Sequence, residues 1–173
     1  MLAKIFPFCY NKYMLTKEKN KMIVTFFGHA NFHETAEYRE ELLSIIRMHE
    51  DKPVDFYLGG YGNFDSFAFR CCKEYQKENP NARLIYITPY LGATLDNNRE
   101  YLEDNYDEIL YPPLEEVPLK FAISKRNEWM VEQADTIIAY VDCHYGGAYK
   151  ALLHAKRKRK LYVNIYKGKY QLY

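Results

Sequence analysis

Residues 54–65 read VDFYLGGYGNFD, and this stretch carries the pattern on which the chain is built. The run Val54–Leu58, rich in apolar and aromatic side chains, is typical of a buried strand. Two glycines follow it, and a helical pattern then extends from Phe64 to Asn79, just before Pro80. A strand, a glycine-bearing turn and a helix in this order predict one β-α unit of an α/β domain.

The same unit recurs on both sides of this stretch. Further apolar runs predict strands at 22–27, 84–88, 108–111, 136–141 and 161–166, and amphipathic segments predict helices at 34–50, 98–105, 119–134 and 147–159. The strand runs are nearly continuous in apolar residues, as in a parallel sheet that is covered on both faces. We therefore expect a Rossmann-like, three-layer α/β/α domain with a mainly parallel sheet.

Length and composition limit the domain organisation and the compartment. The chain has 173 residues, which suits one domain, and we assign it to residues 22–173 after a loosely ordered extension at 1–21. Its four cysteines form no CxxC pair, so we expect reduced thiols and a cytoplasmic protein. The run at 1–13 is interrupted by Lys4, Asn11 and Lys12, which argues against a signal peptide.

Charge and residue usage limit the expected partners. The formal net charge is +1, which exerts no global attraction on nucleic acid or membrane, so we expect neither as a partner. The five histidines show no metal-ligand spacing, and we expect no metal and no cofactor. Tyrosine occurs 18 times, more than one small core needs, which favours a homo-oligomer.

The candidate ligand site follows from the parallel sheet, because such sheets bind ligands beyond the carboxyl ends of their strands. Glycine turns at three of these ends let the backbone approach a ligand, and each precedes a helix whose N-terminus attracts phosphate. Such turns also serve close packing alone, and none matches a dinucleotide fingerprint or a P-loop. The candidate ligand-binding residues are Gly28, His29, Gly59, Gly60, Gly62, Asn63, Phe64, Asp65, Tyr90, Arg126, Asn127, Gly146, Gly147, Ala148 and Tyr149.

Two charged side chains in this set have a functional and a structural interpretation. Asp65 either caps its helix or accepts a sugar hydroxyl, and it is the candidate catalytic carboxylate. Arg126 offers a forked donor to a phosphate, or is a solvated helix arginine. The basic tract at 156–160, KRKRK, is typical of a solvated helix end, although it also suits nucleic acid.

These motifs together resemble the SLOG superfamily, which joins the DNA-processing protein DprA, the LOG phosphoribohydrolases and the YpsA-like proteins. The resemblance rests on Gly28-His29, on the turn from Gly59 to Asp65, and on the series Arg126, Asn127, Met130, Ala134-Asp135, Gly146-Gly147-Ala148 and Ala155. It is strongest to the YpsA-like branch. It implies a nucleotide-derived ligand held by the glycine turns, bound by a sensing or binding module.

The resemblance leaves catalysis open. The LOG signature has a third glycine, a threonine and a glutamate where this chain has Tyr149, Lys150 and Leu153. Cleavage at a sugar needs a carboxylate, and Asp65 or Asp142 would have to supply it. An N-glycosidic hydrolase or ribosyl transferase is therefore the alternative function, and a DprA-like binder of single-stranded nucleic acid is the second alternative.

Overall fold

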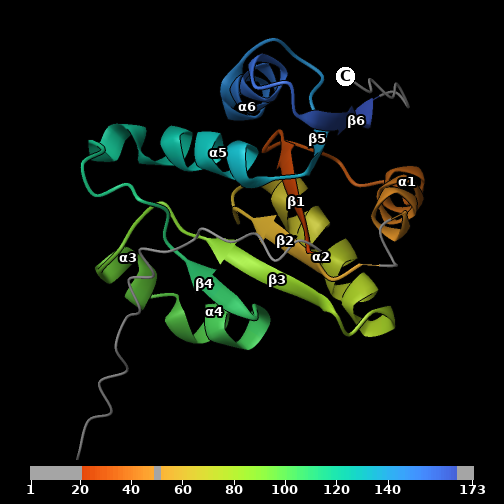
Figure 1. Ribbon diagram of the computed structural model, residues 1–173, viewed down its shortest axis with the longest axis horizontal. Coiled ribbons are helices and arrows are strands. Elements are labelled where there is room, and N and C mark those ends of the chain that lie inside the picture. Colours follow the sequence, from red (N-terminus) through yellow and green to blue (C-terminus); the bar gives the residue numbers. More distant parts are fainter. Residues whose placement is uncertain (1–20, 49–51, 167–173) are drawn as a thin grey trace, which may run out of the picture.

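The computed structural model describes residues 21–48 and 52–166 as a six-stranded sheet with helices on both faces (Figure 1). The strands are β1 (Met22–Gly28), β2 (Val54–Leu58), β3 (Ala82–Ile87), β4 (Glu108–Leu110), β5 (Thr136–Tyr140) and β6 (Leu161–Asn164). Every pairing among them is parallel. The predicted Rossmann-like fold is confirmed, and the predicted extension at residues 1–21 lies, apart from Lys21, outside the described residues.

The strand order is β4-β3-β2-β1-β5-β6. The chain therefore builds outward from β1 in one direction through β4, and then crosses back to place β5 on the other side of β1. Asp135 fixes this junction, because its carboxylate accepts a hydrogen bond from Ile23 N at 2.9 Å and its own N–H donates to Ile23 O at 2.8 Å. The gap between the carboxyl ends of β1 and β5 is the topological switch point of the sheet.

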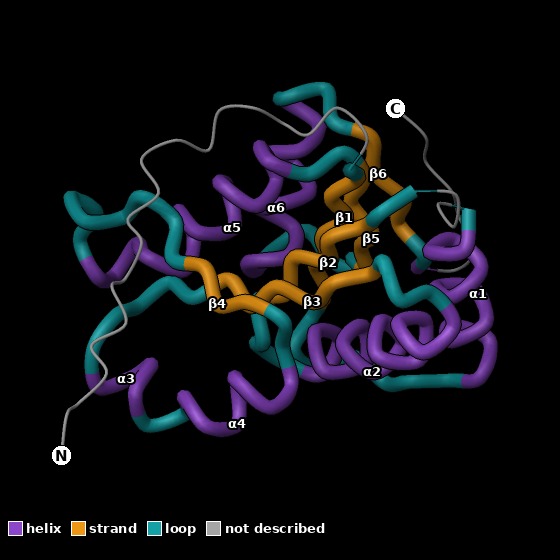
Figure 2. Tube along the Cα trace, turned by 60° about the horizontal axis from the view of Figure 1, so that its bottom comes forward, coloured by secondary structure: helices purple, strands orange, loops and turns teal. Residues whose placement is uncertain are grey.

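Two pairs of long helices cover the two faces of the sheet (Figure 2). On one face, α1 (Ala36–Arg47) and α2 (Asn63–Glu78) pack on Val24, Phe26 and Phe56. On the other face, α5 (Ala122–Gln133) and α6 (Gly146–Arg157) pack on Ile23, Ile85 and Ile137 among others. Successive side chains along a strand thus point into opposite cores. This two-residue alternation is expected of a sheet that is covered on both faces.

The shorter elements lie toward the β4 edge, where α3 (Ala93–Asp96) and α4 (Arg99–Asn105) follow β3, and a 3-10 turn, η1 (Leu119–Phe121), precedes α5. Several element ends differ from the sequence prediction by a few residues, and two of them have a clear structural reason. The first helix begins after Thr35, whose hydroxyl accepts the N–H of Tyr38 and so caps it. The last strand ends at Asn164, whose side chain pairs with the backbone of Val141 instead of continuing the ladder. The four-residue α3 was not predicted.

Candidate functional site

A pocket of about 720 Å³ lies at the switch point. The segments that follow β1, β2 and β5 form it together with one side of α5 and the start of α6. Its lining residues are Phe26, Phe27, Gly28, His29, Ala30, Asn31, Gly59, Tyr61, Gly62, Asp65, Ile123, Arg126, Asn127, Met130, Asp142, Cys143, Tyr145, Gly146, Gly147 and Ala148. This is the place where the parallel fold puts a ligand.

The glycines after β1 and β2 are required for close packing. A Cβ on Gly28 would stand 2.1 Å from the ring of Phe64, and one on Gly59 would stand 2.7 Å from Nη1 of Arg126. Gly62 has a φ of +89°, and a Cβ there would stand 2.8 Å from Cα of Ala30. Close packing alone therefore explains why these three positions are glycine, and no ligand is needed to explain them.

The glycine pair at the start of α6 has a different environment. A Cβ on Gly146 would meet no atom of the described residues within 4 Å, and one on Gly147 would meet only Nδ2 of Asn127, at 4.0 Å. No side chain of the described residues caps this helix, whose N-cap is Tyr145. Open space thus lies in front of a helix N-terminus with a partial positive charge, which is the usual setting for a bound anion.

Arg126 lies beneath the same pocket and is not a solvated helix arginine, because only 2% of it is exposed. Its Nη1 donates to Gly59 O at 2.9 Å and to Ile87 O at 3.0 Å, so it ties the ends of β2 and β3 to α5. Its Nε is buried and has no hydrogen-bond partner among the described residues. Burial lowers the pKa of this guanidinium, and the nearby Asp65 opposes that shift.

Asp65 is a buried carboxyl in the first turn of α2, with 8% of its surface exposed. It accepts the N–H of Tyr61 at 2.8 Å and so stabilises the turn that precedes the helix. Burial raises its pKa to about 6, although the Tyr61 N–H and the charge of Arg126 both favour the ionised form. A carboxyl with this pKa can hold or release a proton near neutral pH.

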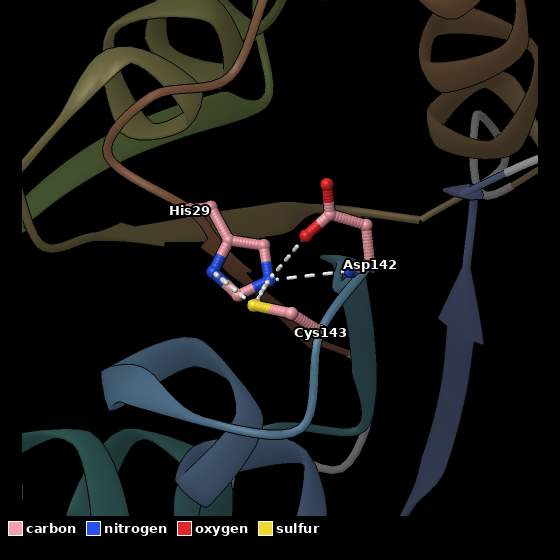
Figure 3. A group of neighbouring side chains, drawn as sticks. All are labelled: His29, Asp142 and Cys143. Carbon is pink, nitrogen blue, oxygen red and sulfur yellow. Dashed lines mark hydrogen bonds and ion pairs between the residues drawn. The ribbon is translucent and has the colours of Figure 1, made fainter.

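Three side chains at the mouth of the pocket converge in a way that the sequence did not indicate (Figure 3). His29 follows β1, whereas Asp142 and Cys143 follow β5. Nε2 of His29 lies 3.0 Å from Oδ1 of Asp142, 3.2 Å from Asp142 N and 3.3 Å from Sγ of Cys143. A nitrogen, a carboxylate oxygen and a sulfur thus meet within 4.8 Å of one another.

Most of the predicted ligand-binding residues line this pocket, and five do not. Gly60 faces Tyr86 and lines a neighbouring cavity of about 510 Å³ between α2 and α4. Asn63 donates to Phe32 O at 3.3 Å, and Phe64 is fully buried beneath Gly28. Tyr90 and Tyr149 line neither cavity, and Tyr149 packs against the core beneath α6. The sequence located the turns but not the direction of each side chain within them.

The basic tract at the end of α6 is largely engaged in local contacts. Lys158 pairs with Glu132 at 2.8 Å, and Nζ of Lys160 donates to the carbonyls of Glu132 and Ala134. These contacts tie the helix end to α5. The tract does not line the pocket.

The fold and the pocket define the class as a Rossmann-like α/β domain with a pocket at the switch point of its sheet. Comparison of structures finds the same fold in DNA processing protein A from Streptococcus pneumoniae, with a TM-score of 0.58 and 14% identity over 83% of this chain. A second match is the single-stranded DNA-binding DNA processing protein A from Helicobacter pylori, with a TM-score of 0.57 and 16% identity over 84% of this chain. The chain spans 50% and 66% of these two proteins.

Sequence comparisons add no family. No family model and no curated protein matches the chain. The structural likeness shows the Rossmann-like fold, and membership of the SLOG superfamily and of its YpsA-like branch stays a prediction.

One expectation about partners is corrected by this likeness. Net charge argued that nucleic acid is not a partner, but a protein of the same fold binds single-stranded DNA. The net charge of a whole chain does not exclude such a partner, because binding depends on the local electrostatic field of the binding surface.

Within residues 21–48 and 52–166, no helix has both the length and the apolar character to cross a membrane.

Proposed function

We propose that the pocket binds the phosphate and the base of a nucleotide unit, and that single-stranded DNA presents this unit. The observation that carries the proposal is the uncapped, open N-terminus of α6 in a pocket that also contains the buried Arg126. The helix N-terminus offers backbone N–H groups and a partial positive charge to a phosphate. Arg126 adds a full positive charge with little solvent to screen it.

Aromatic side chains at the pocket support recognition of a base. Tyr61 and Tyr145 both line the pocket, with 41% and 76% of their surfaces exposed. Arg126 lies 5.2 Å from the ring centroid of Tyr61 and holds that ring from below. Bases of single strands stack on such exposed rings without requiring a particular sequence.

The source of the nucleotide has one competing candidate, a free nucleotide-derived small molecule. Two carboxylates, Asp65 and Asp142, line the pocket beside the groups that attract phosphate. Carboxylates repel a polyanion but accept hydrogen bonds from the hydroxyls of a single sugar. The likeness to a DNA-binding protein favours the strand, and the carboxylates favour the small ligand.

A binding experiment separates the two candidates. Fluorescence anisotropy follows a labelled thymidine oligonucleotide as the chain is added, at several salt concentrations, with mononucleotides as unlabelled competitors. We expect saturable binding that weakens with salt in proportion to the phosphates contacted. Arg126→Lys should weaken it at least about tenfold, because a charge-assisted contact is worth roughly 1.5–3 kcal/mol. Arg99→Lys, on the exposed surface of α4, is the matched control.

The outcome of the competition experiment distinguishes a DNA strand from a free nucleotide as the ligand. Competition by a mononucleotide at the same concentration as the oligonucleotide assigns the site to a small ligand, and release of free base in that mixture adds hydrolysis. Failure of both ligands to bind a chain whose folding is confirmed by circular dichroism overturns the proposal.

A further inference from the structure

We infer that His29, Asp142 and Cys143 form a binding site for a divalent zinc-like cation at the mouth of the pocket. The three residues come from the ends of β1 and β5, which are neighbours in the sheet although they are 113 and 114 residues apart in the chain. Imidazole nitrogen, thiolate sulfur and carboxylate oxygen are the three ligand types that Zn²⁺ takes in proteins. The inference goes beyond nucleotide binding and does not depend on it.

The distances fit such a site with small adjustments. A tetrahedral Zn²⁺ with ordinary bond lengths sets its nitrogen and oxygen ligands about 3.4 Å apart, and its nitrogen and sulfur ligands about 3.6 Å apart. Nε2 of His29 lies 3.0 Å from Oδ1 of Asp142 and 3.3 Å from Sγ of Cys143. A cation therefore requires the Asp142 oxygen and the Cys143 sulfur each to move away from Nε2 of His29 by only a few tenths of an ångström, and all three atoms already lie within 4.8 Å of one another.

The hydrogen bonding of the group also points to a cation. Nε2 of His29 has either one lone pair or one proton, but three polar atoms surround it. A lone pair accepts the Asp142 N–H but then faces the Asp142 carboxylate. A proton satisfies the carboxylate but then faces the N–H. A divalent cation would bind the nitrogen, the oxygen and the sulfur together, which no single proton can do.

The position of the group leaves a place for a fourth ligand. His29, with 9% of its side chain exposed, forms the inner side of the site, and Asp142, with 38% exposed, forms the outer side. All three residues line the pocket, so a fourth ligand would come from the space of the pocket. Zinc sites with three protein ligands keep such a position for water or a bound molecule, and a phosphate oxygen would suit it.

Titration with metal alone tests the inference. The purified chain is stripped with a chelator, and Zn²⁺ is added against a chromophoric competitor in the absence of nucleotide. Cys143→Ser replaces the thiolate with a neutral hydroxyl, and Asp142→Asn replaces the carboxylate with a neutral amide, so each weakens one ligand with little change of shape. His144→Ala is the matched control, because His144 is the next residue, is exposed and contacts Tyr149 instead of the group.

We expect one Zn²⁺ per chain, with affinity lowered at least about tenfold in either ligand variant, since even residues behind the ligands change affinity by 10–100-fold. Co²⁺ should give a thiolate-to-metal charge-transfer band that disappears in Cys143→Ser and persists in His144→Ala. Absence of stoichiometric binding, or equal loss of affinity in His144→Ala, overturns the site. Because the titration contains no nucleotide, failure to bind Zn²⁺ overturns the metal site and leaves the proposed nucleotide binding intact. Conversely, a chain that binds Zn²⁺ but no nucleotide overturns the proposed function and leaves the metal site intact.

Discussion

Substitution of Gly147 by alanine separates folding from ligand binding. A Cβ at this position meets only Nδ2 of Asn127, at 4.0 Å, which is an ordinary contact. Gly147 lies in the first turn of α6, where alanine is favoured over glycine by about 0.5–1 kcal/mol because the unfolded chain is less flexible. The free energy of unfolding should therefore stay the same or increase by up to about 1 kcal/mol.

Binding should change in the opposite direction. The new methyl group occupies the open space in front of the helix N-terminus, where the phosphate has to approach the backbone N–H groups. Loss of one hydrogen bond to a charged group costs about 1.5–3 kcal/mol. At 1.4 kcal/mol for each factor of ten, the dissociation constant should rise about 10- to 100-fold.

Anisotropy with the thymidine oligonucleotide measures the affinity of Gly147→Ala, and urea unfolding measures its stability. Ser44→Ala on the exposed side of α1 adds no atom to the pocket and serves as the control. A Gly147→Ala chain that is stable and binds within about twofold of the original would refute the reasoning. It would show that the ligand's anion does not lie at this helix end.

Three further changes test other parts of the site. Gly28→Ala should destabilise the fold by about 3 kcal/mol or more in urea unfolding, because its Cβ would stand 2.1 Å from the buried Phe64 ring. Asp65→Asn should remove one contribution to the pH dependence of stability. Burial raises the pKa of Asp65 in the folded chain from 3.8 to about 6, so the neutral carboxyl stabilises the fold at low pH and this stabilisation is lost as the pH rises. In thermal melts, the stability of the original chain relative to Asp65→Asn should therefore fall by up to about 3 kcal/mol as the pH rises from 3.8 to about 6, and then level off. Tyr145→Ala should weaken oligonucleotide binding by about 1–3 kcal/mol with an unchanged melting temperature, since the ring is 76% exposed; an unchanged affinity would remove this ring from the base contacts.

The sequence was sufficient to predict the strands and most helices, for a physical reason. The four central strands, β1, β2, β3 and β5, are largely buried on both faces, so their apolar runs are nearly unbroken, as at Val54–Leu58. The strand order could not be predicted, because chain connectivity does not reveal that β5 returns to the far side of β1. Asp135 entered the sequence analysis only as part of the family resemblance, and its two hydrogen bonds to Ile23 show that it joins these strands.

The sequence predicted which turns lie at the site, but it did not predict where the side chains of these turns point. Gly28 and Gly147 both belong to glycine turns near strand ends, yet one lies against an aromatic ring and the other against open space. Phe64 and Tyr149 were proposed to contact a ligand, but the phase of their helices directs both rings toward the core. The group of His29, Asp142 and Cys143 depends on the strand order, so no local pattern could reveal it.

The most direct test of the central claim maps the ligand onto the backbone. Amide shifts of the ¹⁵N-labelled chain are followed by NMR as AMP or a short thymidine oligonucleotide is added. We predict that the largest shifts occur at Gly146, Gly147 and Ala148, with smaller shifts at Tyr61. Shifts confined to the basic tract at 156–160, or no shifts at millimolar ligand, would contradict a nucleotide site at the switch point of the sheet.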